Sequence, residues 1–147
     1  LGKVSREIPS MLNYNVHIEK KSLFNTPPVF AIYATLLNLR WIKKQTIEFI
    51  DQTNHKKAKM LYDEIDNNSL FNGFADVQDR SIMNVTFDLV DNSLSSTFDA
   101  LIEKSKISGV KGHRSIGGYR ASMYNALPIE SVQTLINCMI QLKDKFK

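Results

Sequence analysis

The stretch from residue 27 to 44 is predicted to form a helix that is apolar on nearly every side. Its large apolar residues are Val29, Phe30, Ile32, Tyr33, Leu36, Leu37, Leu39, Trp41 and Ile42. A helix without a polar face is stable only where other protein covers it. We therefore expect this helix to be buried between domains or between subunits. It is too short to span a bilayer, and Asn38 and Arg40 interrupt it.

The overall composition is that of a globular protein. The chain has 147 residues, of which 43% are hydrophobic and 23% are charged, and this length allows one domain with a real core. Neither a signal peptide nor a transmembrane stretch is visible, so we expect no membrane partner. The chain begins at Leu1 and not at methionine, and we expect it to be a piece of a longer protein.

The charge pattern argues against nucleic acid as a partner. The 19 basic and 15 acidic residues give a net charge of +4, which is mild compared with the dense basic stripe of a nucleic-acid-binding protein. The lysine pairs at 20–21, 43–44 and 56–57 are interpreted as solvated helix faces or ends. Cys138 is the single cysteine, so no internal disulfide can form and we expect a cytoplasmic protein. Its apolar neighbours predict a small buried side chain.

Beyond residue 45 the pattern alternates between helices and strands. Apolar residues at three- and four-residue steps predict a helix from about Thr46 to Asn67, followed by a loop to Gly73. Strands are predicted at 81–89, 110–111 and 119–124, and further helices from an Asp91 cap to Lys106 and from Pro128 to the end. This order predicts an α/β fold in which a small sheet is flanked by helices and preceded by two long helices.

The segment GHRSIGGYRASMYN, residues 112–125, suits the binding of a small anion. His113 and Arg114 offer the donors and the positive charge that a phosphate dianion needs together. The glycine pair that follows permits backbone conformations closed to other residues. Arg120 lies across this glycine turn and is suited to a second anion, such as a carboxylate. A hairpin turn with surface arginines is the alternative that these residues leave open.

Asn25 and Thr26 precede two prolines in the segment SLFNTPP and are predicted to cap the apolar helix. Backbone N–H groups at a helix start also bind phosphate, and Asn and Thr side chains add donors. Both interpretations stay open on these residues alone. We expect no metal site, because His17 and His55 lack ligand spacing. The acidic residues of 63–66 are interpreted as a solvated helix end.

Read together, these segments closely resemble phosphoserine aminotransferases, which are dimeric, pyridoxal-phosphate-dependent enzymes of fold type I. The resemblance rests on GHRSIGGYRASMYNALPIESVQTLI and on SLFNTPPVFAIY. IPSMLNY at 8–14, KAKMLYDEID at 57–66 and RSIMNVTF at 80–87 match as well, so it covers essentially the whole chain in collinear order. It implies that residues 1–45 continue from a large domain and carry the cofactor-phosphate and dimer-contact motif. Residues 46–147 would form the C-terminal small domain.

The resemblance also implies an activity and roles for the site residues. Members of the family transfer an amino group between glutamate and 3-phosphohydroxypyruvate, giving 2-oxoglutarate and 3-phosphoserine in serine biosynthesis. Many also act on a related phosphorylated keto acid. By this resemblance, His113 and Arg114 would bind the substrate phosphate or the distal carboxylate of glutamate, and Arg120 the α-carboxylate. Asn25 and Thr26 would contact the phosphate of the other subunit's cofactor in a homodimer.

Departures from the family pattern limit what this chain can do alone. The family's Schiff-base lysine lies upstream of Leu1, as do the residues that hold the pyridine ring. The resemblance therefore implies that the chain contains no catalytic residue and is inactive by itself. Ile82 stands where the family commonly has an arginine. The alternative is a free-standing anion-binding or regulatory module that kept the shape and lost the chemistry.

Overall fold

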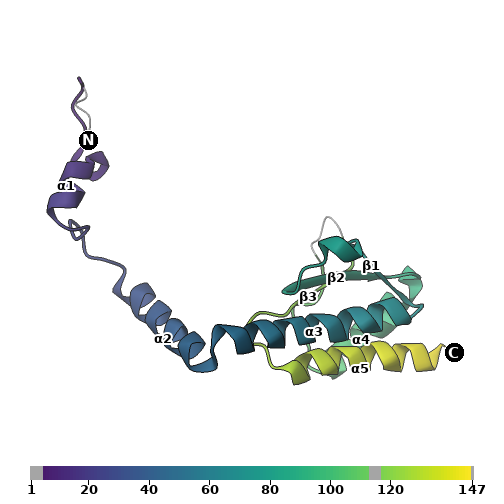
Figure 1. The fold of residues 1–147 in the computed structure, drawn as a ribbon. Coiled ribbons are helices and arrows are strands. Elements are labelled where there is room, and N and C mark those ends of the chain that lie inside the picture. The colour runs from purple at the N-terminus through teal and green to yellow at the C-terminus, as the bar shows by residue number, and fades with distance from the viewer. Residues whose placement is uncertain (1–4, 113–116, 147) are drawn as a thin grey trace. The chain divides into compact units, whose positions relative to one another are not determined.

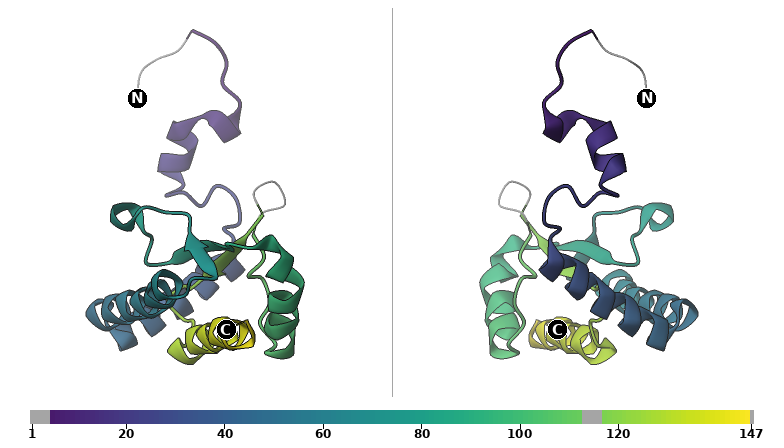
Figure 2. Two further views of the ribbon diagram at one scale, coloured as in Figure 1. Left: turned by 90° about the vertical axis from the view of Figure 1, so that its right-hand side faces the viewer. Right: turned by 90° about the vertical axis from the view of Figure 1, so that its left-hand side faces the viewer.

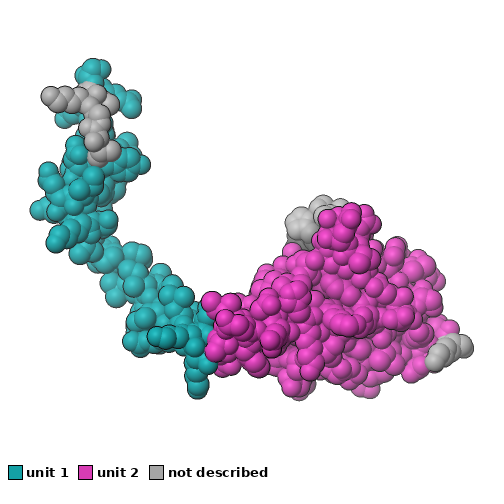
Figure 3. Space-filling model, in the orientation of Figure 1, with its two compact units in different colours: residues 1–44 teal, residues 45–147 magenta. Residues whose placement is uncertain are grey.

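The structure is a computed structural model that describes residues 5–112 and 117–146. Figure 1 shows the order of the helices and strands along the chain. The chain divides into two compact units, residues 1–44 and 45–147, which Figure 3 colours separately. No helix of the described residues is long and apolar enough to cross a membrane.

The first unit begins with short helices that the sequence analysis did not predict. A 3₁₀ helix, η1 (Ser10–Leu12), is followed by the six-residue helix α1 (Tyr14–Glu19). Helix α1 starts where the Asn13 side chain accepts a 3.0 Å hydrogen bond from the amide of Asn15. The sequence shows no sign of these helices, because a helix of six residues or fewer carries no periodic apolar pattern.

The predicted apolar helix is α2 (Val29–Gln45), and it begins later than expected. Its first amides donate hydrogen bonds to the carbonyl groups of Pro27 (2.8 Å) and Pro28 (3.0 Å). The prolines therefore occupy the entry of the helix, and Asn25 and Thr26 lie before it. The interpretation of these two residues as helix caps was wrong.

Helix α2 buries none of its side chains within this chain. Phe30 is 84% exposed, and other large apolar residues of the helix are exposed as well. A contiguous apolar surface of this kind is a typical site of association with other protein. Burial of α2 between domains or subunits thus stays a prediction about a larger assembly.

The described part of the second unit is a three-stranded antiparallel sheet with helices on one face. The strands lie side by side in the order β1 (Phe71–Gly73), β2 (Asn84–Leu89) and β3 (Tyr119–Ser122). The helices are α3 (Ile47–Asn67), α4 (Ser95–Lys104) and α5 (Ile129–Lys145), with short 3₁₀ helices η2 (Val77–Asp79) and η3 (Asn92–Leu94). Figure 2 shows α3, α4 and α5 on the same side of the sheet. The predicted fold class, a small sheet flanked by helices, is confirmed.

The alternation of side chains along the strands decides which residues stay open. In β2, Val85 and Phe87 are buried toward the helices, whereas the residues between them are partly exposed. In β3, Tyr119 and Ala121 are buried and Arg120 is exposed. Successive side chains of a strand point to opposite faces of a sheet. Arg120 therefore lies on the face that the helices leave open.

Four aromatic rings from three strands and one helix form the centre of the core: Phe71, Phe87, Phe98 and Tyr119. Tyr119 stacks on Phe87 with 5.5 Å between ring centroids and meets Phe98 edge-on at 5.0 Å. Such aromatic pairs contribute about 0.5–1.5 kcal/mol each beyond the burial of their area. This packing fixes β3, and with it the strand position of Arg120.

The strand boundaries differ from the prediction. Strand β1 was expected to be loop, which was wrong; its three residues pair with β2 but are too few to show alternation. Strand β2 starts at Asn84 rather than at residue 81, because the Ser81 hydroxyl accepts two backbone hydrogen bonds of 3.1 Å there. Instead of a strand at 110–111, only an isolated bridge joins Lys111 to Tyr119. The Asp91 cap is confirmed, since its carboxylate accepts a 2.9 Å bond at the start of η3.

Lys57 was interpreted as part of a solvated helix face, and this was wrong. Its side chain is fully buried. Its ammonium group donates to the backbone carbonyls of Met123 (3.2 Å), Tyr124 (2.8 Å) and Leu127 (3.2 Å). Three carbonyl dipoles replace the water that a buried cation loses. Lys57 therefore ties α3 to the turn between β3 and α5.

Candidate functional site

The glycine-rich segment joins the sheet through a narrow neck, formed by Lys111, Gly112, Gly118 and Tyr119. The amide of Gly112 donates a 2.8 Å hydrogen bond to the carbonyl of Gly118. Lys111 and Tyr119 form the bridged pair next to it. The two sides of the loop are thus held together at its base, directly beside β3.

Glycine is required at the neck for steric and conformational reasons. A Cβ atom on Gly112 would clash with the carbonyl oxygen of Gly117. Gly117 and Gly118 have φ angles of 78° and 63°, which lie in the left-handed region that residues with a Cβ avoid. The backbone conformation inferred for the glycine pair from the sequence is therefore present.

His113 and Arg114, the predicted phosphate ligands, lie outside the described residues. In the sequence they follow Gly112 directly, so the segment that carries them starts and ends at the neck. Their role in anion binding stays a prediction.

Arg120 lies beside the neck on the open face of the sheet. Its Cα is opposite that of Thr86 on β2, and its amide donates a 2.6 Å hydrogen bond to the carbonyl of Val110. Its side chain is exposed, and among the described residues no carboxylate forms an ion pair with it. A planar guanidinium group in this position is available to a carboxylate ligand.

Asn25 and Thr26 belong to the first unit, and both are exposed. The side-chain amide of Asn25 lies 3.8 Å from Sδ of Met11, to which it donates a weak hydrogen bond. An amide and a hydroxyl group are neutral donors that suit phosphate oxygens. The donor chemistry of this pair therefore fits the phosphate end of pyridoxal phosphate. The neck and Arg120 belong to the second unit. The structure therefore describes the Asn25–Thr26 pair separately from the neck and Arg120.

Lys57 does not fit the role of a lysine that anchors such a cofactor. It is the one buried lysine among the described residues. All three of its N–H donors have backbone carbonyl partners, and burial lowers the pKa of Lys57. The sequence does hold a signal for this burial, because Lys57 lies three positions after Asn54 and four before Leu61 on the inward stripe of α3.

The acidic end of α3 is part of a structural ion pair. Arg80 donates to both carboxylate oxygens of Asp66 at 2.7 Å and lies 4.4 Å from the centroid of the Tyr62 ring. The hydrogen bond from Arg80 lowers the pKa of Asp66. The expectation of a merely solvated helix end was wrong for this residue. Ile82, which stands in place of the family's arginine, packs half-buried against the core.

Cys138 lies in the core of the second unit. Its thiol donates to the hydroxyl of Ser105 at 3.2 Å, so the predicted buried, structural role is confirmed. Across the described residues, no cluster of three or more His, Cys, Asp or Glu side chains is arranged to hold a metal ion.

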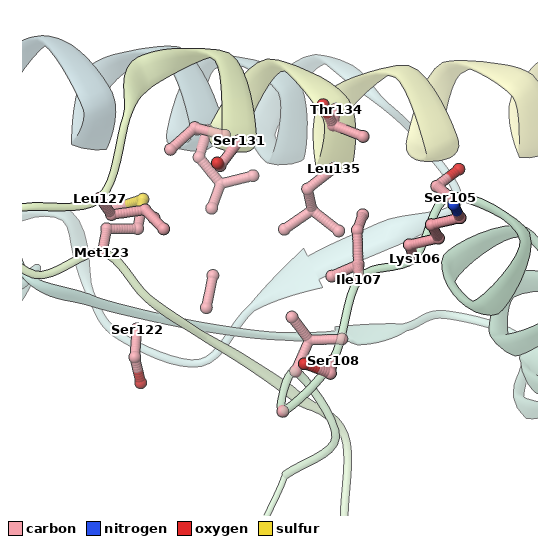
Figure 4. Close-up of a pocket in the computed structure, with 15 residues that line it drawn as sticks. Ser105, Lys106, Ile107, Ser108, Ser122, Met123, Leu127, Ser131, Thr134 and Leu135 are labelled. Atoms are coloured by element: carbon pink, nitrogen blue, oxygen red, sulfur yellow. The ribbon is translucent and has the colours of Figure 1, made fainter.

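A pocket of about 360 Å³ lies between α5, β3 and residues 105–110 (Figure 4). Hydroxyl groups line part of it: Ser105, Ser108, Ser122, Ser131 and Thr134. The sequence offers no signal for this pocket, because its walls come from separate elements that only the fold brings together.

Comparison with known proteins decides the family. The family model described as aminotransferase class-V matches residues 2–135. The chain belongs to the class-V aminotransferases. Among its class-V relatives, the phosphoserine aminotransferase of Flavobacterium psychrophilum is 55% identical over 146 residues, covering 99% of this chain and 41% of the relative. That of Bacteroides thetaiotaomicron is 55% identical over 142 residues, covering 95% of this chain and 40% of the relative. The chain thus spans about two fifths of the length of these class-V aminotransferases.

Solved class-V structures have the same fold. A phosphoserine aminotransferase from a study of radiation damage to its Schiff base has a TM-score of 0.84 and 44% identity, covering 98% of this chain and 40% of that one. The enzyme of Bacillus circulans subsp. alkalophilus has a TM-score of 0.84 and 42% identity, covering 95% and 39%. The pyridoxal-phosphate-bound enzyme of Trichomonas vaginalis has a TM-score of 0.78 and 33% identity, covering 94% and 40%. The sheet and its helices match the C-terminal domain of phosphoserine aminotransferase.

Proposed function

We propose that this chain is the C-terminal part of a phosphoserine aminotransferase and supplies residues that recognise its substrates. The whole protein transfers an amino group between glutamate and 3-phosphohydroxypyruvate, giving 2-oxoglutarate and 3-phosphoserine. The observation that carries this proposal is the match to a phosphoserine aminotransferase over 99% of the chain at 55% identity. The neck geometry and the exposed position of Arg120 support it independently.

The site residues divide the charges of the substrate between them. Arg120 binds the α-carboxylate, because its guanidinium group is exposed and has no carboxylate partner among the described residues. His113 and Arg114 bind the phosphate of phosphoserine, or the distal carboxylate of glutamate. Both groups of donors fall within residues 113–120 of the sequence.

Pyridoxal phosphate, when bound, supplies the electron sink on which amino-group transfer depends. In this chain Asn25 and Thr26 are assigned to its phosphate, across the subunit interface of a homodimer. Because Lys57 is engaged by three carbonyls, the lysine that anchors the cofactor is assigned to the protein outside this chain. The chain alone is therefore expected to be inactive in amino transfer.

We further propose that the protein acts in the cytoplasm on small molecules and not on nucleic acid. A single cysteine and a net charge of +4 support these two assignments, because structural disulfides and dense basic surface are both lacking in the sequence.

A transamination assay tests the proposed function directly. The full-length protein that contains this chain is loaded with cofactor and assayed with glutamate and 3-phosphohydroxypyruvate, beside the 147-residue chain. Activity in the full-length protein alone supports the proposal. An inactive but folded, cofactor-loaded protein, together with tight phosphoserine binding by the 147-residue chain, would favour the free-standing anion-binding module.

A further inference from the structure

The pocket of about 360 Å³ between α5, β3 and residues 105–110 combines an apolar floor with a single cation. Its floor includes Leu61, Met123, Val132 and Leu135, each at most 4% exposed. Of the described residues that line the pocket, Lys106 alone is charged. A pocket of this size and lining suits a small ligand with an apolar body and one negative charge.

The cation and the apolar floor lie at different ends of this pocket. Figure 4 shows Ser105 and Lys106 at one end and Met123 and Leu127 at the other, with Leu135 between them. A ligand that lies along the pocket would therefore have its charged group near Lys106 and its apolar part near Met123.

Lys106 occupies a backbone position that favours glycine. Its φ angle is 57°, in the left-handed region that residues with a Cβ avoid. Its amide donates to the carbonyl of Glu103 (2.9 Å), and the next amide, of Ile107, donates to the carbonyl of Ile102 (3.1 Å). This is the hydrogen-bond pattern of a helix end at which glycine is the usual residue. The backbone thus gives no reason for a lysine here, and strain of this kind points to a role of the side chain.

The ammonium group of Lys106 is available to a ligand. Lys106 is exposed, and within the described part of the chain it forms no ion pair. Ser108 and Ser131 also line the pocket, and their hydroxyls have no hydrogen-bond partner among the described residues. The Thr134 hydroxyl, in contrast, donates to the carbonyl of Glu130 at 2.8 Å. The donors left for a ligand are therefore one ammonium group and two hydroxyls.

We propose that this pocket binds a small aliphatic monocarboxylate, of the class of short fatty acids. Its carboxylate pairs with Lys106, and its hydrocarbon chain lies on the apolar floor. A phosphate dianion would need several charged donors together, whereas one ammonium group matches a monocarboxylate. Arg120 does not line this pocket, because its side chain lies on the opposite face of β3. The proposal therefore does not depend on the function proposed for Arg120.

Methyl NMR of the full-length protein that contains this chain tests the site, with hexanoate as the probe and hexanamide as its neutral counterpart. The Met123 methyl signal, assigned by its loss in Met123→Leu, should shift when hexanoate is added. Hexanoate should bind about two- to fivefold more tightly than hexanamide, as expected for an ion pair with an exposed lysine. Arg120→Ala should leave both affinities at this signal unchanged.

Two variants of Lys106 separate its charge from its backbone strain. Lys106→Gly removes the charge and the strained Cβ, and should raise the thermal unfolding midpoint. Lys106→Gln removes the charge alone. Both should abolish the preference for hexanoate, whereas Lys104→Gln, exposed on α4 and outside the pocket lining, should keep it. An unshifted Met123 signal, equal binding of both probes by the unmodified protein, or a preference that persists in both Lys106 variants would each overturn the proposal.

Discussion

The amide of Gly112 donates a 2.8 Å hydrogen bond to the carbonyl oxygen of Gly118, and this bond closes the loop that carries the predicted phosphate ligands. Both partners are glycines because the backbone leaves no room for a Cβ at one and has a positive φ at the other. The same closure brings the loop base next to β3, where Arg120 reaches the open face. In the sequence, the predicted phosphate ligands follow Gly112 directly, and Arg120 lies two positions after Gly118.

Replacing Gly112 by alanine is expected to destabilise the second unit by about 1–3 kcal/mol, the usual cost of overpacking. The added methyl group would clash with the carbonyl oxygen of Gly117 and lie 2.9 Å from that of Gly118. Denaturant unfolding measures the change in the free energy of unfolding. Gly73→Ala is the matched control, because its Cβ would meet its nearest neighbours at 3.7 and 3.8 Å. A similar loss in both variants would contradict the steric explanation.

Lys57→Met is expected to cost about 3 kcal/mol of stability, because the buried carbonyls that its ammonium group satisfies would lose their partner. Those carbonyls belong to the turn after β3, so amide exchange should accelerate there first. The exposed neighbour Lys56 supplies the control, since Lys56→Met should stay within about 0.5 kcal/mol of the unmodified chain. A loss no larger than that of the control would show that Lys57 does not hold this turn.

Much of the fold could be predicted from the sequence, because the long elements repeat their patterns. Helices α3 and α5 carry apolar stripes over several turns, and β2 alternates cleanly between buried and half-exposed residues. Helix α1 and strand β1 could not be predicted, since six and three residues are too few for either period. The burial of Lys57 could not be predicted from residue type, because lysine side chains are mostly exposed, although residue 57 lies on the inward stripe of α3.

In the candidate site, too, local sequence patterns predict some features, whereas contacts between distant residues could not be predicted. The position of Arg120 on an open face follows from the alternation in β3, which the sequence segment YRAS already suggests. The hydrogen bond from the Tyr119 hydroxyl to the Asp99 carboxylate could not be predicted. The two residues are 20 positions apart along the chain, and only the packing of α4 on the sheet brings them together. Pairing of Asp66 with Arg80, 14 positions apart, was missed for the same reason.

The Asp66–Arg80 pair predicts a specific dependence of stability on pH. Hydrogen bonding to Arg80 places the pKa of Asp66 below its ordinary value of 3.8. The folded state therefore binds this proton less readily than the unfolded chain, so the pair stabilises the fold above the unfolded pKa. That stabilisation is lost as the pH falls through the lowered folded pKa.

Asp66→Asn should accordingly lower the free energy of unfolding at pH 7 by about 1 kcal/mol, a modest figure because Asp66 is 46% exposed. The difference from the unmodified chain should shrink in acid. Urea unfolding at a series of pH values measures both quantities. A difference that is constant from neutral pH into acid would rule out the ion pair as its cause.

Helix α2 predicts that the 147-residue chain self-associates in solution. Its exposed apolar residues include Phe30, Ile32, Leu37 and Leu39, and contiguous apolar surface of this kind favours association. Sedimentation should show a mass that rises with concentration, and Phe30→Glu with Leu37→Lys should reduce it. Exposed apolar residues on α5 offer a control, since Ile140→Lys should leave the association unchanged. A strictly monomeric unmodified chain would contradict this expectation.

Arg120 and Arg114 are expected to affect different parts of the substrate in the full-length enzyme. Arg120→Ala should weaken the binding of amino donors and of amino acceptors alike, because all of them carry the α-carboxylate. Arg114→Ala should raise the KM for the phosphorylated keto acid more than that for a smaller, unphosphorylated one. Each lost charge-assisted contact is expected to cost about 1.5–3 kcal/mol in transition-state binding. Steady-state kinetics of both variants with both acceptors measure this, and Lys56→Ala serves as the control, because Lys56 is exposed on α3 and belongs to neither segment. If Arg114→Ala raised the KM equally for the two acceptors, Arg114 would not bind the substrate phosphate. Arg120 would then be the one remaining substrate ligand assigned to this chain.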